Sequence, residues 1–257
     1  MSAPDETRWL YWKEPSNPRV EFAFWRGARP PALAMHFHDE AQITLMLSGS
    51  RAFDVGGAGF HVACQRALFV PAGMPHRSAL DGRGDAACLN IYFAATSSDP
   101  DRPLLFDATD GVFAAQAGDV AALLQAIDRM LRGPVQVAAA RDATTPRSST
   151  PALSFEDARP IGRVARDQAL SREGFSRRFR RVVGMPPHAY RLAGRLNEAR
   201  RRLREDVSVA HVAADLGFSD QSHFGRLFRR AFGVSPARYR TGERPSQMFQ
   251  TSGLPGV

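Results

Sequence analysis

Apolar and polar residues alternate along short segments in the first hundred residues of the chain. In the segment 42–47, Ile43, Leu45 and Leu47 fall on one face of an extended strand. The alternation returns in four later segments, at 51–55, 60–64, 67–70 and 88–93. Many short strands separated by Gly and Pro turns predict an all-β barrel or sandwich over about residues 20–95.

After Asp119 the apolar spacing changes to that of a helix. Five apolar residues fall on one helical face: Val120, Leu123, Leu124, Ile127 and Leu131. This stripe fits either a contact between two copies of the chain or packing on the barrel, and the pattern leaves both open. Residues 133–157 are rich in Pro, Ala, Ser and Thr and predict a flexible linker.

The C-terminal part contains an internal repeat. Residues 172–191 return as 221–240 at an offset of 49, with nine of 20 positions identical. The shared residues include Phe175/Phe224, Arg177/Arg226, Phe179/Phe228, Arg180/Arg229 and Gly184/Gly233. A repeat of this length predicts two copies of one supersecondary unit.

The second copy has the pattern of a helix-turn-helix. Ser208 is expected to cap a first helix, Gly217 supplies a turn residue that tolerates positive φ, and Ser219 is expected to cap a second helix. That second helix has an apolar back around Phe224 and Phe228 and a basic front.

The first copy has the same layout, with Phe175, Phe179 and Val182 expected inside. Leu192, Leu196, Ala199 and Leu203 predict a long helix between the copies. The plain alternative for one such unit is a helical hairpin with a solvated basic face. Two copies in register, with Arg at the same outward positions, favour DNA binding.

The net charge of +8 is unevenly distributed. Residues 159–244 carry 20 Arg against 8 acidic residues, a surplus of +12, and the rest of the chain has a balance of −4. Only the C-terminal part is therefore expected to meet a polyanion. Two cysteines without CxxC spacing, no apolar run of membrane-spanning length and no signal-peptide pattern indicate a cytoplasmic protein.

Residues 209–240 resemble the signature of the AraC family of transcription regulators, and the similarity extends over about residues 158–241. The resemblance implies two helix-turn-helix units joined by a long helix. It also implies which residues contact DNA, by matching position: Glu173, Ser176, Arg177 and Arg180 in the first unit, and Ser222, His223, Arg226 and Arg229 in the second. Arg180 and Arg229 would lie nearer the phosphates.

The chain departs from the family pattern at two places. Ala169 stands where the first turn usually has Gly, so this turn is expected to be strained or altered. The segment 146–160 shows little helical pattern, although a helix usually precedes the first unit. The first unit is therefore expected to contribute less to affinity than the second.

Two short motifs, His36-Phe-His38 and the segment 71–76 ending in His76, resemble those of cupin barrels. Many AraC-type regulators carry such a barrel as an effector sensor. Gln42 stands where metal-binding cupins have an acid, so we expect no metal and no cofactor. His36, His38, Gln42 and His76 are instead candidates for effector contact, with hydrogen-bonded structural histidines as the alternative.

These features predict a multidomain α and β protein: a cupin-like β-barrel at 1–110, a helical segment at 111–132, the linker at 133–157, a double helix-turn-helix domain at 158–243 and a flexible tail at 244–257. We expect a transcription regulator, by family resemblance an activator. It would bind double-stranded DNA at two boxes about one helical turn apart and be controlled by a small-molecule effector. RNA polymerase and a second copy of the chain are further suggested partners. The alternative is a metal-dependent cupin enzyme with a helical appendage.

Overall fold

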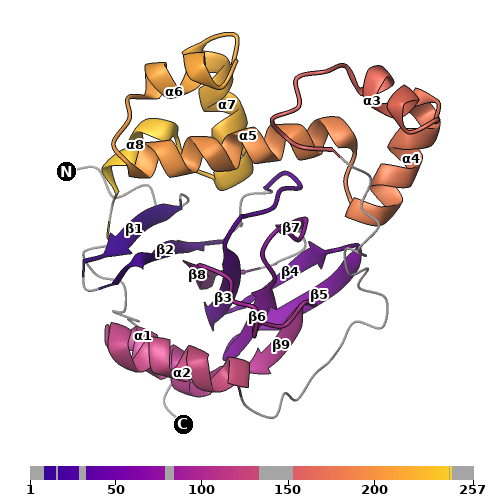
Figure 1. Ribbon diagram of the computed structural model, residues 1–257. Coiled ribbons are helices and arrows are strands. Elements are labelled where there is room, and N and C mark those ends of the chain that lie inside the picture. Colours follow the sequence, from indigo (N-terminus) through magenta and orange to yellow (C-terminus); the bar gives the residue numbers. More distant parts are fainter. Residues whose placement is uncertain are drawn as a thin grey trace.

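The N-terminal half forms two antiparallel sheets around a shared interior (Figure 1). The computed structural model describes residues 9–15, 17–28, 33–78, 84–132, 153–242 and 244. The six-stranded sheet has the order β1 (Leu10–Glu14), β2 (Asn17–Gly27), β8 (Ala86–Phe93), β3 (Ala41–Ser48), β6 (Arg66–Val70) and β9 (Leu104–Asp107). The three-stranded sheet has the order β5 (Ala58–Ala63), β4 (Ser50–Val55) and β7 (His76–Ser78).

The two faces of β3 separate two apolar clusters. Ile43, Leu45 and Leu47 pack on the outer side of the large sheet, as their alternation predicts. Met46 faces the barrel interior. All five predicted strands are present, and β1, β2, β7 and β9 are strands that the pattern did not predict individually.

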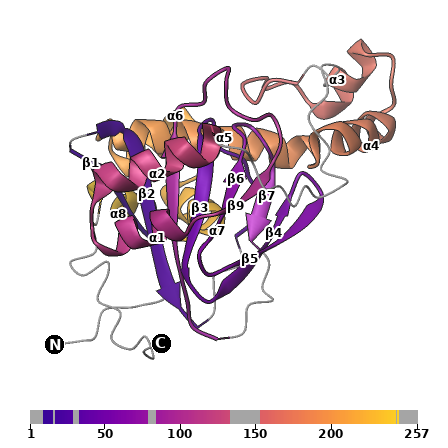
Figure 2. The same ribbon diagram turned by 90° about the horizontal axis from the view of Figure 1, so that it is seen from below.

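Two helices cover the outer face of the large sheet. These are α1 (Thr109–Gln116) and α2 (Val120–Arg132), which lie in front of the strands in Figure 2. Asp119 caps α2, because its carboxylate accepts a hydrogen bond from the Ala122 amide at 2.9 Å. Leu123 and Ile127 are buried against the sheet. The inner part of the predicted stripe therefore packs on its own barrel.

The C-terminal half is helical and contains the predicted repeat. The first unit is α3 (Ile161–Asp167) and α4 (Arg172–Val183), and the second is α6 (Val209–Asp215) and α7 (Gln221–Phe232). The long helix α5 (Pro187–Arg204) joins them, and α8 (Pro236–Thr241) follows the second unit. Pro187 and Pro236 occupy the first helical turn of α5 and α8, so the repeat continues past each recognition helix.

The two units have different neighbours in the core. Phe228 and Phe232 of α7 belong to one apolar cluster with Tyr11 and Trp25 of the barrel. Phe175 and Phe179 of α4 lie in a separate cluster. In that cluster Val183 is buried, whereas the predicted Val182 is only partly covered, because α4 presents the later residue to the core. The second unit therefore shares its core with the barrel interior.

The residues before α3 lie along α5. Phe155 fits closely over Gly194, where a Cβ atom would stand 2.4 Å from the phenylalanine side chain. The start of the predicted linker, 133–152, and most of the predicted tail, 245–257, lie outside the described residues. None of the helices in the described part of the chain is both long and apolar enough to cross a lipid bilayer.

The turns of the two units differ at one residue, as the sequence indicates. Ala169 has a φ of 55° and Gly217 has a φ of 68° at the corresponding turn. A Cβ atom makes this left-handed conformation unfavourable by roughly 1–2 kcal/mol. The first turn is therefore strained where the second is not.

We expect Ala169→Gly to raise the melting temperature of the protein, since glycine removes this strain at a cost of about 0.4–1 kcal/mol in unfolded-chain entropy. The control is Ala214→Gly, at an exposed position in the last turn of α6. There glycine should lower stability by about 1 kcal/mol. Thermal unfolding measures the melting temperatures of both variants. If Ala169→Gly lowers the melting temperature as much as Ala214→Gly does, the turn at Ala169 is not strained.

Candidate DNA-binding surface and sensor interior

The second recognition helix, α7, begins at a side-chain cap and ends at a left-handed glycine. The Asp220 carboxylate accepts a hydrogen bond from the His223 amide at 2.6 Å. Asp220 is therefore the cap, and the prediction of Ser219 was wrong by one residue. Ser219 instead pairs its hydroxyl with His223 Nδ1 at 3.0 Å. Gly233 ends the helix with a φ of 73°.

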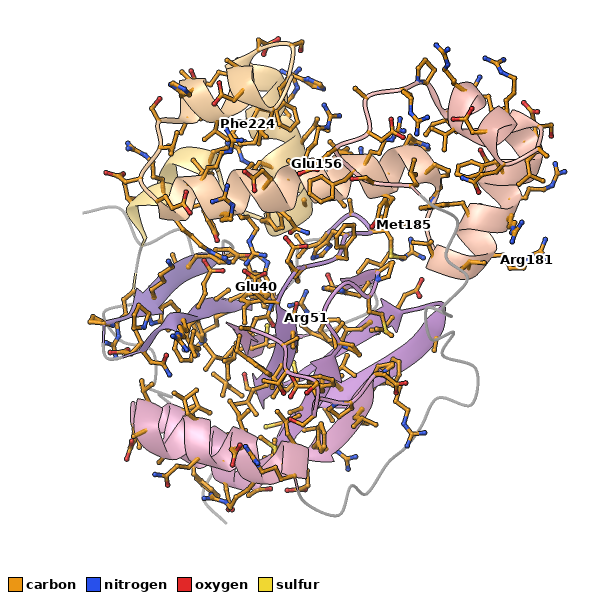
Figure 3. The ribbon with its side chains drawn as sticks, in the orientation of Figure 1. Glu40, Arg51, Glu156, Arg181, Met185 and Phe224 are labelled. Carbon is orange, nitrogen blue, oxygen red and sulfur yellow. The ribbon has the colours of Figure 1, made fainter. Side chains whose placement is uncertain are left out.

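The first recognition helix, α4, is built in the same way. The Ser171 hydroxyl accepts from the Gly174 amide at 3.0 Å, and Gly184 ends the helix with a φ of 86°. Figure 3 shows the two units on opposite ends of α5, with Arg181 on α4 far from Phe224 on α7. A helix of 18 residues spans about 27 Å.

The predicted DNA-contacting residues lie on the outer sides of both helices. All eight are on α4 or α7: six are exposed, and Ser176 and His223 are partly covered. The four arginines make no ion pair within the described part of the chain: Arg177, Arg180, Arg226 and Arg229. Neighbouring Arg201 and Arg202 are instead held by Glu198. The outward arginines are therefore available to an external anion.

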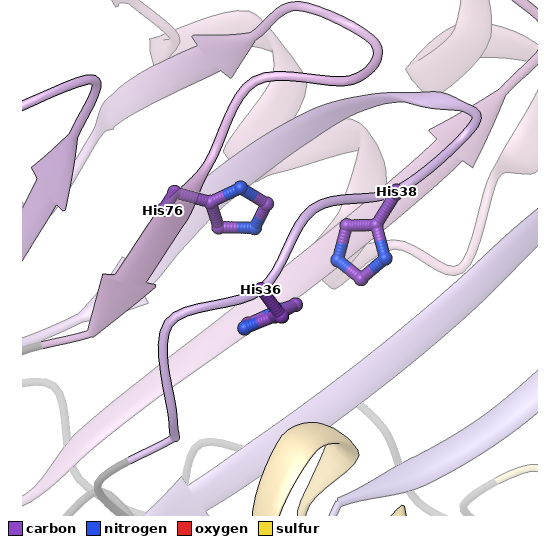
Figure 4. Close-up of side chains that lie close together, drawn as sticks. All are labelled: His36, His38 and His76. Atoms are coloured by element: carbon purple, nitrogen blue, oxygen red, sulfur yellow. The ribbon is translucent and has the colours of Figure 1, made fainter. Parts of the chain in front are cut away.

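Three histidines come together at the barrel mouth (Figure 4). His36 and His76 form a reciprocal backbone bridge, with N···O distances of 3.0 and 2.7 Å. His38 lies two residues on, and its ring centroid is 4.8 Å from that of His36 and 5.0 Å from that of His76. The structure thus joins three of the four predicted effector residues.

Gln42, the fourth predicted residue, begins a buried polar chain on the interior faces of β3 and β8. Its amide donates to the Thr44 hydroxyl at 2.8 Å, and that hydroxyl donates to Asn90 at 2.9 Å. The Asn90 amide donates to the Tyr92 hydroxyl at 3.1 Å. Tyr92 lies against His38, with ring centroids 4.9 Å apart.

Arg200, from the middle of α5, closes the histidine cluster. Its Nη1 donates to His38 Nδ1 at 2.7 Å, and its side chain is 1% exposed. Its guanidinium lies 4.9 Å from the Tyr92 ring centroid and 5.1 Å from that of Phe232. Arg200 carries no local mark in the sequence, because its role arises only where a helix of one domain lies over the interior of the other.

Two carboxylates of the barrel hold Arg200 and its neighbour Arg204. Glu21 on β2 accepts from Arg200 Nη2 at 2.5 Å, and it also accepts from Arg204 and from the Tyr239 hydroxyl. Glu40 accepts from both arginines. Burial alone would raise the pKa of Glu40, but Arg200 and Arg204 lower the pKa to about 2. These contacts form the domain joint, defined as Glu21, Glu40, Arg200, Arg204 and Tyr239.

The proton positions in the histidine cluster follow from their partners. His36 Nδ1 is 2.7 Å from the Ala34 carbonyl, and His76 Nδ1 is 2.9 Å from the Met74 carbonyl. A carbonyl oxygen only accepts, so both Nδ1 atoms carry the proton and both Nε2 atoms keep a lone pair. Arg200 only donates, so His38 Nδ1 accepts and His38 Nε2 carries the proton.

A metal ion does not fit this donor set. The cluster offers two lone pairs and one N–H group, whereas a catalytic zinc site uses three donors. The Arg200 cation also stands directly on the third histidine. The arrangement suits a polar ligand group instead and gives no support to the metal-dependent enzyme alternative.

Comparison with known proteins gives two matches that together span most of the chain. The family model of the AraC-like ligand binding domain matches residues 17–142. A helix-turn-helix domain model matches residues 164–242. The chain belongs to the AraC family.

Individual curated relatives of this AraC-family protein match about a third of its length. The HTH-type transcriptional regulator MtrA of Neisseria gonorrhoeae is 37% identical over 86 residues, 33% of this chain and 29% of that protein. The HTH-type transcriptional activator RhaS of Escherichia coli (strain SE11) is 40% identical over 80 residues, 31% of this chain and 29% of that protein. The matched region thus spans under a third of these curated relatives.

The same fold occurs in solved structures of ToxT from Vibrio cholerae. One crystal form is 8% identical, covers 90% of this chain and 99% of that one, and has a TM-score of 0.51. The K231A variant is 10% identical, covers 88% and 98%, and also has a TM-score of 0.51. The order of a β-rich domain and a double helix-turn-helix domain is therefore shared.

We expect no stoichiometric transition metal in protein purified without chelator. The reason is that only His36 and His76 offer a lone pair, whereas Arg200 occupies the accepting nitrogen of His38. Elemental analysis by mass spectrometry measures this directly. One bound equivalent that is lost in both His36→Ala and His76→Ala would contradict it.

The folded protein should lose stability as pH falls from about 6.5. Burial lowers the pKa of His76 to about 4, and burial with neighbouring cations lowers the pKa of His36 and His38. In the unfolded chain a histidine titrates near pH 6.5. Between these values the unfolded state binds more protons, so the free energy of unfolding falls with falling pH.

The test compares melting temperatures from pH 7.5 to pH 5 in wild type, His76→Asn and His188→Asn. Asparagine can still donate to the Met74 carbonyl but does not titrate, so His76→Asn should show a shallower decline. His188 is exposed, and its variant should follow wild type. If the melting temperature of His76→Asn falls with pH as steeply as that of wild type, His76 is not a buried neutral histidine.

Proposed function

We propose that this protein is a sequence-specific transcription regulator of the AraC type that binds double-stranded DNA through α4 and α7. The observation that carries the proposal is the pair of recognition helices on opposite ends of α5. Both carry arginines at equivalent outward positions that form no ion pair with any described residue. Arg177 and Arg226 suit bidentate contact with guanine, and Arg180 and Arg229 suit phosphates. We place its action in the cytoplasm.

Two helices on one rigid connection suit successive major grooves about one helical turn, or roughly 34 Å, apart. The contact residues differ between the copies, with Glu173 and Ser176 in one and Ser222 and His223 in the other. The target is therefore an asymmetric pair of boxes. The name of RhaS favours activation, with RNA polymerase as a further partner. A second copy of the chain is proposed to contact the outer side of α2.

We propose that the barrel senses a small molecule and transmits its presence through the domain joint. The histidine cluster contacts Arg200 through His38, and the polar chain from Gln42 ends at Tyr92. Arg200 lies over the Tyr92 ring, so the two networks meet there. A ligand group that takes the place of Arg200 on His38 would release α5 from the barrel. His36, His38 and His76 are its proposed polar contacts, and Gln42 is a fourth.

Binding-site selection on Arg177→Ala and Arg226→Ala tests the base-reading roles. Each change should cost about 1–3 kcal/mol and relax base preference mainly in its own box. The strained Ala169 turn predicts that Arg226 has the larger effect.

The matched control is Arg229→Ala, which should weaken binding to all sequences alike and lower the salt slope by about one. If both other variants lose affinity yet keep the wild-type base preference, the base-reading assignment is wrong. If the wild-type protein binds no DNA with a steep salt dependence, the regulator proposal itself is wrong.

A further inference from the structure

Arg51 is a cation buried inside the barrel, away from the domain joint. It lies on β4, where Arg51, Phe53 and Val55 alternate toward the interior. Its side chain is 1% exposed. The guanidinium carbon is 5.4 Å from the Trp9 ring centroid, 5.2 Å from that of Trp25 and 5.3 Å from that of Phe53. In Figure 3 Arg51 is labelled among the strands, farther from α5 than Glu40.

One edge of this guanidinium has no hydrogen-bond acceptor. Nη1 donates to the Cys88 sulfur at 3.1 Å, but Nε and Nη2 have no hydrogen-bond partner among the described residues. No carboxylate of the described residues forms an ion pair with Arg51. Arg200 is equally buried yet is paired with Glu21, Glu40 and His38. Buried polar groups are almost always hydrogen-bonded, so the empty edge calls for an explanation.

The empty edge has the geometry that binds a carboxylate. The Nε–H and one Nη2–H bond point the same way, as a planar fork that matches the two oxygens of a carboxylate. The Trp9 ring packs against this guanidinium, and its buried Nε1, on the ring edge beside Gly233, is a further donor without an acceptor among the described residues. Three donors with no acceptor favour a group that only accepts, which a carboxylate does.

We propose that Arg51 and Trp9 bind the carboxylate of an organic acid whose body is aromatic or aliphatic. Arg51 provides the Nε/Nη2 fork, and Trp9 Nε1 donates to one of the same oxygens. The rings of Trp25 and Phe53 form apolar walls for the body. Met46 and Met74 belong to the same cluster, and unbranched methionine side chains adjust to admit a ligand. This rests on the proposed sensing function and names its ligand class.

The site has a direct contact to the second recognition helix. Trp9 lies on Gly233, the C-terminal cap of α7, where a Cβ atom would stand 2.2 Å from the Trp9 ring. A carboxylate that draws the Trp9 indole toward Arg51 therefore changes the surface on which α7 ends. The ligand would reach the DNA-binding domain through Trp9, separately from the histidine cluster.

The first test needs no ligand and uses the full chain. Arg51→Met replaces an unpaired buried cation with an apolar side chain of similar length. The melting temperature of this variant should stay unchanged or rise. The rise should be about 3 °C if the substitution removes the whole free-energy cost of burying the unpaired Nε and Nη2 groups. Arg200→Met is the matched control and should lower the melting temperature, since it removes a buried cation that is paired with Glu21, Glu40 and His38. A loss in Arg51→Met as large as in Arg200→Met would overturn the proposal.

The second test uses sodium acetate, phenylacetate and octanoate, each against its neutral amide at constant ionic strength. Acetate carries the head group alone, so the result does not depend on the ligand body. The acids should raise the melting temperature of wild type and change the tryptophan fluorescence in a Trp12→Phe background, where the two remaining tryptophans, Trp9 and Trp25, both lie beside Arg51. The amides should do neither. Arg51→Met should abolish both effects, and Trp9→Phe should weaken acid binding about tenfold, the value of one charge-assisted hydrogen bond.

Equal effects of acids and amides, no effect of any acid, or acid binding that survives Arg51→Met would each overturn the proposal. DNA binding is measured on the same preparations. If DNA binding stands while the acids fail, only the ligand class is wrong. If DNA binding fails while the acids bind at Arg51, the regulator proposal is wrong and the acid site stands.

Discussion

The contact of Arg200 with Glu21 holds the sensor barrel and the DNA-binding domain in one arrangement. Removing such a pair from water costs several kcal/mol per ion, so it persists only where every remaining donor and acceptor is satisfied. Here Arg204, Glu40, Tyr239 and His38 provide those partners. A joint that depends on a complete set of polar contacts is cooperative, because losing one partner weakens the rest. It is therefore suited to having two states.

Contacts on either side of the domain joint connect the barrel to both helix-turn-helix units. On one side Asn197 donates to the Phe37 carbonyl at 2.9 Å, and Phe37 stacks on Tyr190 near the first unit. On the other side the Tyr11 hydroxyl donates to the Phe232 carbonyl at 3.0 Å in the second unit. The barrel thus contacts both units at once, while the outward arginines stay uncovered. Contact with the barrel therefore sets the relative position of the two recognition helices without covering their DNA-facing sides.

The sequence predicted the features that depend on local pattern. The alternation in 42–47 gave the correct faces of β3, and the repeat gave both helix-turn-helix units and the helix between them. Gly217 and the missing glycine at 169 were also found, since φ is a local property. Short β7 and β9 lack enough residues to show a period. The assignment of Ser219 failed because Asp220 beside it is an equally good cap.

For the sensor interior, the sequence indicated only the residues that belong to one domain and lie in a short motif. His36, His38 and His76 were found because a motif marks them, and the structure brings them together. Arg200 and Glu21 carry no local mark, since their roles arise from pairing across 179 residues of sequence. Arg51 reads as an ordinary strand arginine until the interior around it is known. Contacts between the two domains are thus the feature of the site that could not be predicted from the sequence pattern.

The two glycines that end the recognition helices have a consequence for how such a protein can evolve. The barrel meets α7 at Gly233 through Trp9 and lies near α4 at Gly184 through Pro75. Both contacts involve backbone at the last turn, whereas the proposed base-contacting side chains stand on the earlier turns and outer faces. The residues that choose a DNA sequence and those that seat the helix on the sensor are therefore different sets. Mutation can retarget such a protein to a new promoter while its response to a signal is inherited unchanged.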